Sequence, residues 1–375
     1  MQKPNDLEQT TSSSESATQQ PIVTQAKPKK LPVTVLTGFL GAGKSTLLNY
    51  ILSQNHGYRI AIIENEFGEV SIDDALIVTS KEEVVELSNG CLCCTLRGDL
   101  IGALTKLSQK KDKFDYICIE TTGLALPGPI VQTFYLDEQV RNEYYLDGIV
   151  TVVDSKHIIQ HLHHHHHEKK HGEEEEEEEE EENEAEDQVA FADRIIVNKV
   201  DLIDEDTKKK VLKKIRKING LSPICETSHS KIDLSFILNI RAFDIDRVLN
   251  MDPNLLKEMD EHQHEEEHDH HHKHDHHDAE VTSYAIVKPG VVDKEKFEDW
   301  LLDLLTERGL DIYRTKGFLN VGEAKPLVVQ AVHSLLDMRF FGEWKNNDTT
   351  NKLVFIGKYL DHEELNEGFN ACLKQ

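Results

Sequence analysis

The sequence lacks the apolar runs that membrane or exported segments require. None of its 375 residues falls in a run of about eighteen apolar positions, the length that a membrane-spanning helix needs. The N-terminus also has no apolar core of the kind found in a secretory signal peptide. We therefore expect a soluble cytoplasmic protein with no membrane partner, long enough to bury the cores of two domains.

A disulfide framework is lacking as well. The chain has six cysteines, and three of them, Cys91, Cys93 and Cys94, are crowded into one short segment. Secreted disulfide-bonded domains space their cysteines out, so this clustering indicates a reducing compartment and either a metal site or reactive thiols.

The 42 basic residues are outnumbered by 69 acidic residues, which argues against one class of partner. The net charge is −27, but residues 157–188 carry −12 of it and residues 257–280 carry −8, so the remaining residues carry only −7. Nucleic-acid binding depends on lysines and arginines that neutralise phosphates, and this chain has no excess of them. We expect no nucleic-acid partner.

The same two acidic segments are of low complexity. Five consecutive histidines (His163–His167) precede ten consecutive glutamates (Glu173–Glu182), and residues 262–277 interleave nine histidines with acids. Such segments contain too little apolar surface to fold and are predicted to be solvated loops or linkers. Their imidazoles could bind Zn²⁺, Ni²⁺, Co²⁺ or Cu²⁺ weakly, or the segments could serve only to solubilise the chain.

Short apolar runs alternate with helix-length segments in residues 31–250. These runs are Leu31–Thr37, Arg59–Glu64, Tyr116–Glu120, Gly148–Asp154 and Arg194–Asn198, and the first leads through a glycine loop into a helix at Ser45–Ser53. The alternation predicts an α/β domain whose mostly parallel sheet is covered by helices on both faces.

The flanking regions have a different character. Residues 1–30 are polar and predicted to be a disordered tail, and residues 251–280 are predicted to be a His/acid-rich linker. Residues 281–375 follow a β-α-β-β-β-α order that predicts a small α+β, ferredoxin-like domain. Its expected elements are Val281–Val287, Asp293–Leu305, Ile312–Val321, Leu327–His333, Lys352–Gly357 and Asp361–Leu373, with Asp361 as the cap of the last helix.

The glycine loop has the pattern of a phosphate-binding loop. Its residues are Gly38, Phe39, Leu40, Gly41, Ala42, Gly43, Lys44 and Ser45, followed by Thr46. Backbone N–H groups and the helix N-terminus can surround phosphate oxygens, Lys44 can reach the β- and γ-phosphates, and the Ser45 hydroxyl can ligate Mg²⁺. The strand-loop-helix context favours this P-loop NTPase interpretation over an incidental glycine turn.

Two further motifs extend the nucleotide site. Asn198, Lys199 and Asp201 form an N-K-x-D sequence after a predicted strand, which favours guanine because Asp201 can accept hydrogen bonds from the guanine N1–H and 2-amino groups. Glu120 ends another strand and could organise Mg²⁺, while the Gly123 N–H could contact the γ-phosphate. Alternatively, Glu120–Thr122 could form a helix or turn cap. No glutamine or arginine finger is evident, so we expect slow hydrolysis.

The clustered cysteines favour a soft metal ion. Thiolates select Zn²⁺, Cu⁺ or iron–sulfur clusters, and Zn²⁺ prefers four ligands, so Cys91, Cys93 and Cys94 leave one position for water, Glu66 or a ligand from an acceptor protein. A redox thiol switch remains an alternative. Cys118 and Cys372 are expected to be core residues, and Cys225 is left unassigned.

In combination, these motifs resemble the CobW-like metallochaperone family of P-loop GTPases, related to HypB and UreG, and most closely its eukaryotic zinc-regulated GTPase metalloprotein activators. The matching segments are Gly38–Ser45, Glu64–Glu69, Cys91–Cys94, Glu120–Gly123 and Asn198–Asp201.

The resemblance implies a C-terminal CobW-type domain and a GTPase that uses GTP and Mg²⁺ to transfer Zn²⁺ to a client, type 1 methionine aminopeptidase. The tail has no clean match to the Pro-x-Leu-Val motif with which animal members dock to that client. A cobalt- or nickel-inserting GTPase and a zinc buffer or sensor with vestigial hydrolysis are the alternatives.

Overall fold

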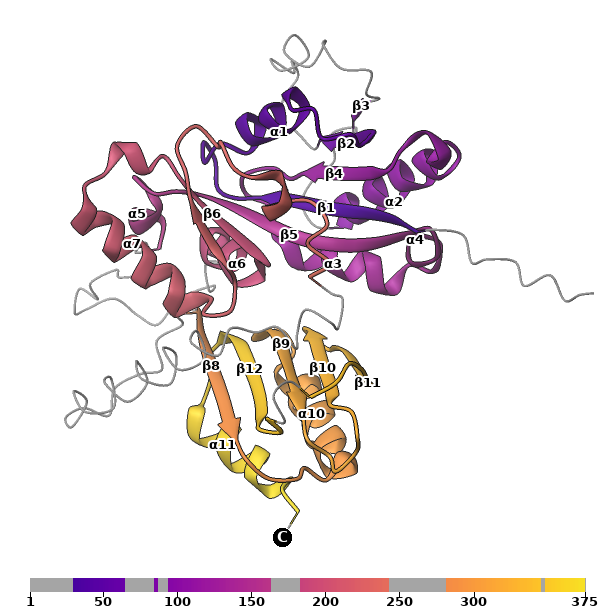
Figure 1. Cartoon of the computed structure of the whole chain (residues 1–375), viewed down its shortest axis with the longest axis vertical. Helices are drawn as coiled ribbons and strands as arrows, with labels where there is room; N and C mark the ends of the chain where they lie inside the picture. The colour runs from indigo at the N-terminus through magenta and orange to yellow at the C-terminus, as the bar shows by residue number, and fades with distance from the viewer. Residues whose placement is uncertain are drawn as a thin grey trace, which may run out of the picture.

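The computed structural model describes residues 30–64, 84–86, 94–162, 183–242, 281–344 and 348–374. Within these residues, seven strands form one sheet in the order β3-β2-β4-β1-β5-β6-β7, and every neighbouring pair is parallel (Figure 1). The strands are β1 (Leu31–Thr37), β2 (Ile60–Glu64), β3 (Val84–Glu86), β4 (Tyr116–Glu120), β5 (Tyr144–Asp154), β6 (Arg194–Asn198) and β7 (Ile224–Glu226). The predicted parallel α/β sheet is confirmed.

Helices cover both faces of this sheet, since its strands are apolar on both sides. The helices are α1 (Lys44–Ser53), α2 (Cys94–Ser108), α3 (Pro127–Leu136), α4 (Glu138–Glu143), α5 (Ile158–His161), α6 (Glu184–Phe191) and α7 (Glu205–Ile218). Ile117 and Ile119 of β4 belong to the core beneath α2, α3, α6 and α7, whereas Tyr116 and Cys118 belong to the core beneath α1 and residues 232–242. The alternation along β4 thus joins two cores, and the prediction that Cys118 is a core residue is confirmed.

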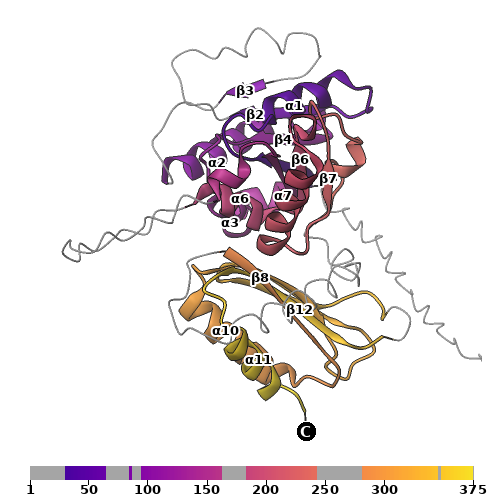
Figure 2. The ribbon, with the colours of Figure 1, turned by 90° about the vertical axis from the view of Figure 1, so that its left-hand side faces the viewer.

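The C-terminal residues form an antiparallel sheet in the order β11-β10-β9-β12-β8. Its elements are β8 (Val281–Lys288), α10 (Lys294–Arg308), β9 (Ile312–Leu319), β10 (Leu327–Val332), β11 (Leu335–Phe340), β12 (Asn351–Lys358) and α11 (His362–Ala371). Both helices pack on one face of the sheet, as Figure 2 shows. The predicted small α+β domain is confirmed, with β11 as an additional strand.

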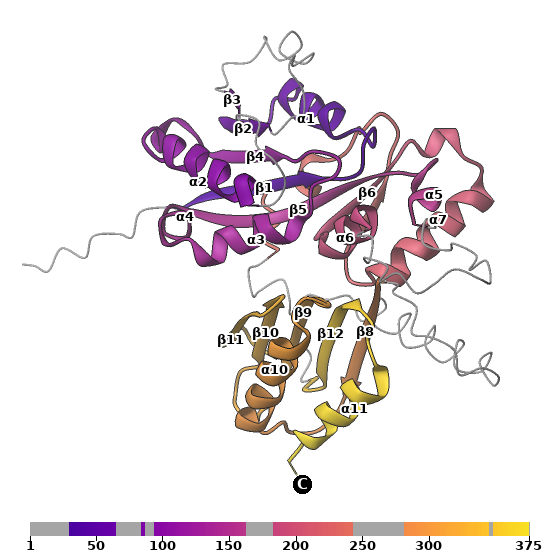
Figure 3. The same ribbon diagram turned by 180° about the vertical axis from the view of Figure 1, so that it is seen from behind.

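The opposite face of the C-terminal sheet packs against the first domain, below α3, α6 and α7 (Figures 2 and 3). Ala285, Tyr313 and Val354 belong to the same apolar cluster as Val189 and Phe191 of α6. The two domains therefore share a continuous core. No helix of the described ranges is both long and apolar enough to cross a membrane.

Candidate nucleotide site

The phosphate loop runs from the end of β1 into α1, and its shape requires glycine. Gly38, Gly41 and Gly43 have φ values of 138°, 73° and 110°, a region of backbone conformation that residues other than glycine rarely adopt. A Cβ on Gly38 would lie 2.1 Å from the Val152 carbonyl oxygen, and one on Gly43 would lie 2.5 Å from Asn198 Nδ2. Close backbone approach and left-handed backbone thus both fix the glycine pattern.

Lys44, the first residue of α1, places its amine inside this loop. Its Nζ donates to the carbonyl oxygens of Gly38 at 2.7 Å and Phe39 at 3.4 Å. Burial lowers the pKa of Lys44 below its usual value, and the nearby Glu120 carboxylate partly offsets this effect. A cation in a glycine loop at a helix N-terminus suits a phosphate group.

Ser45 and Glu120 meet beside the loop. The Ser45 hydroxyl donates to Glu120 Oε1 at 2.8 Å, which joins the start of α1 to the end of β4. A hydroxyl and a carboxylate are hard oxygen ligands of the type that Mg²⁺ prefers. These two side chains therefore fit the Mg²⁺ ion that a nucleoside triphosphate would bring.

The segment after Glu120 packs directly on the phosphate loop. The Thr121 N–H donates to the Leu36 carbonyl at 3.0 Å, and a Cβ on Gly123 would lie 2.6 Å from the Leu40 nitrogen. The next helix, α3, begins at Pro127 with Leu126 in the cap position. No side chain caps this N-terminus, so Glu120–Thr122 do not cap α3.

Asn198 connects the N-K-x-D segment to the phosphate loop. It is buried at the end of β6, and its amide donates to the Ala42 carbonyl at 2.9 Å and to Ser230 Oγ at 3.0 Å. Its Oδ1 accepts from the Ser230 N–H at 3.0 Å, and Ser230 Oγ donates to the Gly43 carbonyl at 3.1 Å. Asn198 and Ser230 together fix the phosphate loop through its Ala42 and Gly43 carbonyl groups.

Lys199 and Asp201 differ in their surroundings. Lys199 has a left-handed backbone (φ 62°), and its Nζ donates to Asp154 Oδ2 at 2.8 Å. Asp201 is exposed, and a hydrogen bond from the Ser228 side chain holds the pKa of its carboxyl below the usual value. An ionised, accessible carboxylate at this sheet edge can accept hydrogen bonds from a base that presents two donors.

The predicted zinc site is only partly described. Cys94 is the first residue of α2, whereas Cys91, Cys93 and Glu66 lie outside the described residues. In the part of the chain that the structure covers, no cluster of three or more His, Cys, Asp or Glu side chains could hold a metal ion. The prediction that Cys372 is buried is confirmed, and Cys225 is half-buried, with its thiol pKa raised by burial.

Three residues of the site were missed by sequence reasoning: Asp154, Ser228 and Ser230. Ser228 and Ser230 follow β7, which has only three residues. His229 and Ser230 adopt left-handed backbone at φ 56° and 54° without any glycine to signal a turn. The available signal was the short polar run after Cys225, which contains no glycine and matches no known motif.

Comparisons with known proteins identify the family of both domains. Residues 32–226 match the nucleotide-binding domain of the CobW/HypB/UreG family, and residues 281–373 match the cobalamin synthesis protein cobW C-terminal domain. The zinc chaperone YjiA of Escherichia coli is 34% identical over 350 residues, which cover 92% of this chain and 99% of YjiA.

Zinc-regulated GTPase metalloprotein activator 1 of Schizosaccharomyces pombe is 33% identical over 356 residues, 88% of this chain and 83% of that protein. The crystal structure of Zn(II)-bound YjiA GTPase superposes with a TM-score of 0.69 at 30% identity, covering 92% of this chain and 100% of the other. The chain therefore belongs to the CobW/HypB/UreG family of nucleotide-binding proteins.

Proposed function

We propose that the protein is a GTP-hydrolysing zinc metallochaperone that delivers Zn²⁺ to a client metalloprotein. The observation that carries the proposal is the single linked site in which Lys44, the Ser45–Glu120 pair and Asn198 meet around one glycine loop. The relatives named as zinc chaperones and as zinc-regulated GTPase metalloprotein activators support the same function.

In this proposal each residue of the nucleotide site has a defined role. Lys44 neutralises negative charge on the phosphates, and the backbone N–H groups of residues Gly38 to Thr46 donate hydrogen bonds to them. Ser45 and Glu120 would hold Mg²⁺, which supplies charge neutralisation at the transferred phosphate. Asp201 selects guanine, Lys199 flanks the base, and the Gly123 N–H faces the γ-phosphate.

Zn²⁺ is the cargo in this proposal. The thiolates of Cys91, Cys93 and Cys94, completed by Glu66 or by a ligand from the acceptor, suit a soft ion that must be released. These residues lie in sequence between the phosphate loop and Glu120, where GTPases place the segments that respond to the γ-phosphate. We infer that GTP and GDP forms hold zinc with different affinity.

The client that we propose is type 1 methionine aminopeptidase. The likeness to proteins named zinc-regulated GTPase metalloprotein activators supports a metalloprotein client, and the resemblance of the sequence motifs implies that this client is the aminopeptidase. The proposal predicts that zinc-loaded protein with GTP activates the apo-aminopeptidase faster than the same protein with GDP.

The test combines zinc affinity with client activation. Chelator competition should give different zinc dissociation constants for the GTP and GDP forms, and Cys93→Ala should abolish both zinc loading and aminopeptidase activation. Equal zinc affinities in the two nucleotide states would contradict the coupling while leaving GTP hydrolysis intact. Competition with Co²⁺ and Ni²⁺ on the same protein decides whether zinc is the preferred cargo.

A further inference from the structure

Helix α6 is a short buried element between the nucleotide site and the C-terminal domain. Residues 185–192 are all buried, and α6 contacts α3, β5 and α7 on one side and β8 and β9 on the other. Asn183 caps its first turn by accepting from the Glu186 N–H at 3.2 Å. At the other end Asn219 Nδ2 donates to the carbonyls of Val189, Ala190 and Ala192 at 2.8, 3.2 and 3.1 Å. The helix is therefore fixed at both ends.

Gln188, in the middle of α6, forms hydrogen bonds with the segment that follows Glu120. Its side chain is almost fully buried, and its Nε2 donates to the carbonyls of Gly123 at 3.0 Å and Ala125 at 3.2 Å. Its backbone carbonyl accepts from Thr151 Oγ1 at 2.6 Å. Both N–H groups of the Gln188 amide thus hold one loop.

Gly123 is the point at which this loop meets the phosphate loop. There is no room for a Cβ on Gly123, because it would lie 2.6 Å from the Leu40 nitrogen. A small displacement of Gly123 therefore changes where its N–H lies relative to a bound phosphate, and sub-ångström placement of such donors controls reaction rates. Gln188 determines that placement from outside the phosphate loop.

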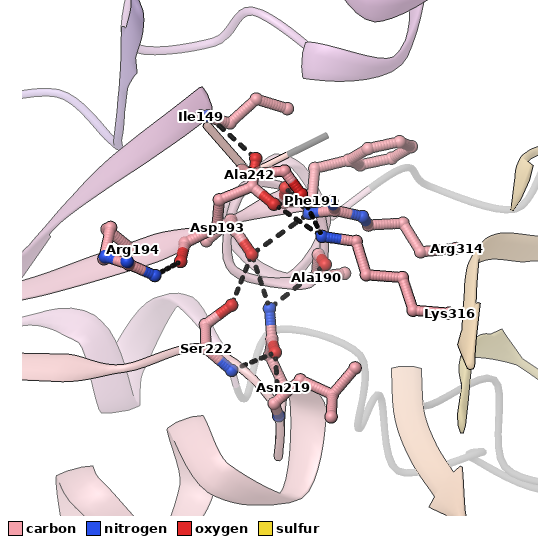
Figure 4. A network of polar contacts seen from close by, with 12 residues as sticks. Ile149, Ala190, Phe191, Asp193, Arg194, Asn219, Ser222, Ala242, Arg314 and Lys316 are labelled. Atoms are coloured by element: carbon pink, nitrogen blue, oxygen red, sulfur yellow. Dashed lines mark hydrogen bonds and ion pairs between the residues drawn. The ribbon is translucent and has the colours of Figure 1, made fainter. Parts of the chain in front are cut away.

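The C-terminal end of α6 is held by the C-terminal domain, as Figure 4 shows. The Arg314 guanidinium of β9 donates to the Phe191 carbonyl at 2.6 Å and the Ala192 carbonyl at 3.2 Å, and pairs with Asp193 Oδ1 at 2.6 Å. The guanidinium makes these three contacts from two separate nitrogens in a fixed fork, a geometry that the single nitrogen of a lysine does not reproduce. A continuous set of contacts thus runs from β9 through α6 to Gly123.

We propose that Gln188 is a positioning residue for GTP hydrolysis, and that the C-terminal domain, through Arg314, fixes the helix that carries it. This inference rests on the proposed GTPase function. It assigns the C-terminal domain a part in the hydrolytic step, in addition to any contact with a client.

The test compares Gln188→Met, which keeps the length of the side chain but removes both donors, with Thr151→Val as the matched control. Thr151→Val removes the hydrogen bond to the Gln188 backbone and leaves the amide contacts in place. We expect Gln188→Met to lower kcat for GTP about tenfold or more, with GDP affinity within roughly twofold of the wild type, since GDP has no γ-phosphate. Thr151→Val should lower kcat much less than Gln188→Met, because the two amide contacts to Gly123 and Ala125 remain.

A second arm tests the domain contact. Arg314→Lys keeps a cation beside Asp193, so the chain should stay folded, and it should lower kcat about threefold to tenfold. When combined with Gln188→Met it should add little further loss, because both changes act through one helix. Thermal unfolding with bound GDP checks that every variant is folded.

Three results would overturn the inference: equal loss of GTP and GDP affinity in Gln188→Met, the same kcat loss in Thr151→Val, or fully additive effects of Arg314→Lys and Gln188→Met. Absence of hydrolysis in the wild type would instead reject the proposed function. Hydrolysis in the wild type that Gln188→Met leaves unchanged would reject the inference alone.

Discussion

At the scale of single residues, two glycines of the phosphate loop are required for different reasons. Gly38 has φ 138° and would place a Cβ 2.1 Å from a backbone oxygen of β5, whereas Gly41 has φ 73° and faces open space. A left-handed alanine costs about 1–2 kcal/mol, but a clash with a buried strand has no local remedy.

We therefore predict that Gly38→Ala abolishes GTP binding in titration calorimetry, while Gly41→Ala weakens it by about tenfold. Circular dichroism establishes that both variants are folded. Similar losses in the two variants would show that backbone conformation alone, and not the contact with Val152, makes Gly38 necessary.

Asn198 and Asp201 stand three positions apart in one motif but should respond differently to substitution. Asn198 is buried and bonded to Ala42 and Ser230, so Asn198→Ala should lower the free energy of unfolding by about 1–3 kcal/mol and weaken GTP and ATP binding alike. Asp201 is exposed, so Asp201→Asn should leave stability unchanged and weaken only GTP, by about tenfold or more.

Urea denaturation and parallel GTP and ATP titrations measure both outcomes. If Asp201→Asn weakens ATP binding as much as GTP binding, the assignment of guanine specificity to Asp201 is wrong. The amide introduced by Asp201→Asn would present a donor to a base edge that also donates, which is the physical basis of the expected selectivity.

At the scale of elements, local caps contribute separable increments of stability. Asp361 caps α11, and its Oδ1 accepts from the Glu364 N–H at 2.9 Å. We predict that Asp361→Ala lowers the free energy of unfolding by about 1 kcal/mol, whereas Asp361→Asn, which keeps the acceptor, changes it little. Urea denaturation of the full chain tests this, and an equal loss in both variants would assign the effect to charge and not to the cap.

The elements that sequence reasoning placed well are those whose signals are local. β1, β4 and β6 have the predicted bounds because buried parallel strands are continuous apolar runs between polar turns. β5 instead begins at Tyr144, before the predicted Gly148. Its register with β1 skips Asp147, whose carboxylate accepts from the N–H groups of Ile240 and Arg241. A strand that is bent around a polar bulge looks like a turn in sequence.

The same distinction applies to the site. The phosphate loop and the N-K-x-D motif are contiguous, so their spacing revealed them. Gln188 contacts Gly123 across 65 residues and Asp154 contacts Lys199 across 45. β11 was missed because the turn at His333, with φ 48°, contains no glycine. Contacts between distant residues leave no periodic signal in one sequence.

At the scale of the whole molecule, the two domains are joined by a buried ion network around Asp193. Asp193 lies just after the end of α6, accepts from the Ile149 N–H at 2.9 Å, and pairs with Arg314 at 2.6 Å and Lys316 at 2.9 Å. Burial alone would raise the pKa of Asp193, but Arg314 and Lys316 hold it at about 2. Burial and the neighbouring Arg314 lower the pKa of Lys316 to about 8. Asp193, Arg314 and Lys316 therefore form one buried ion network that links the two domains.

This network predicts a specific dependence of stability on pH. The pKa of Asp193 is lower in the folded chain than in the unfolded chain, so the ionised carboxylate stabilises the fold above about pH 4, and this contribution is lost as pH falls from about 4 toward 2. Asp193→Asn leaves Arg314 and Lys316 without their buried partner and should cost about 3–5 kcal/mol at pH 7.

The matched control is Asp348→Asn. Hydrogen bonds from Thr350 and Lys352 also lower the pKa of Asp348 to about 2, but its side chain is 46% exposed, so solvent screening should make its loss much smaller. Urea unfolding at pH 5, 4 and 3 should give a gap in the free energy of unfolding between wild type and Asp193→Asn that narrows as the pH falls below about 4. A gap of the same size at every pH would mean that Asp193 joins the domains through its packing and hydrogen bonds, with no contribution from its charge.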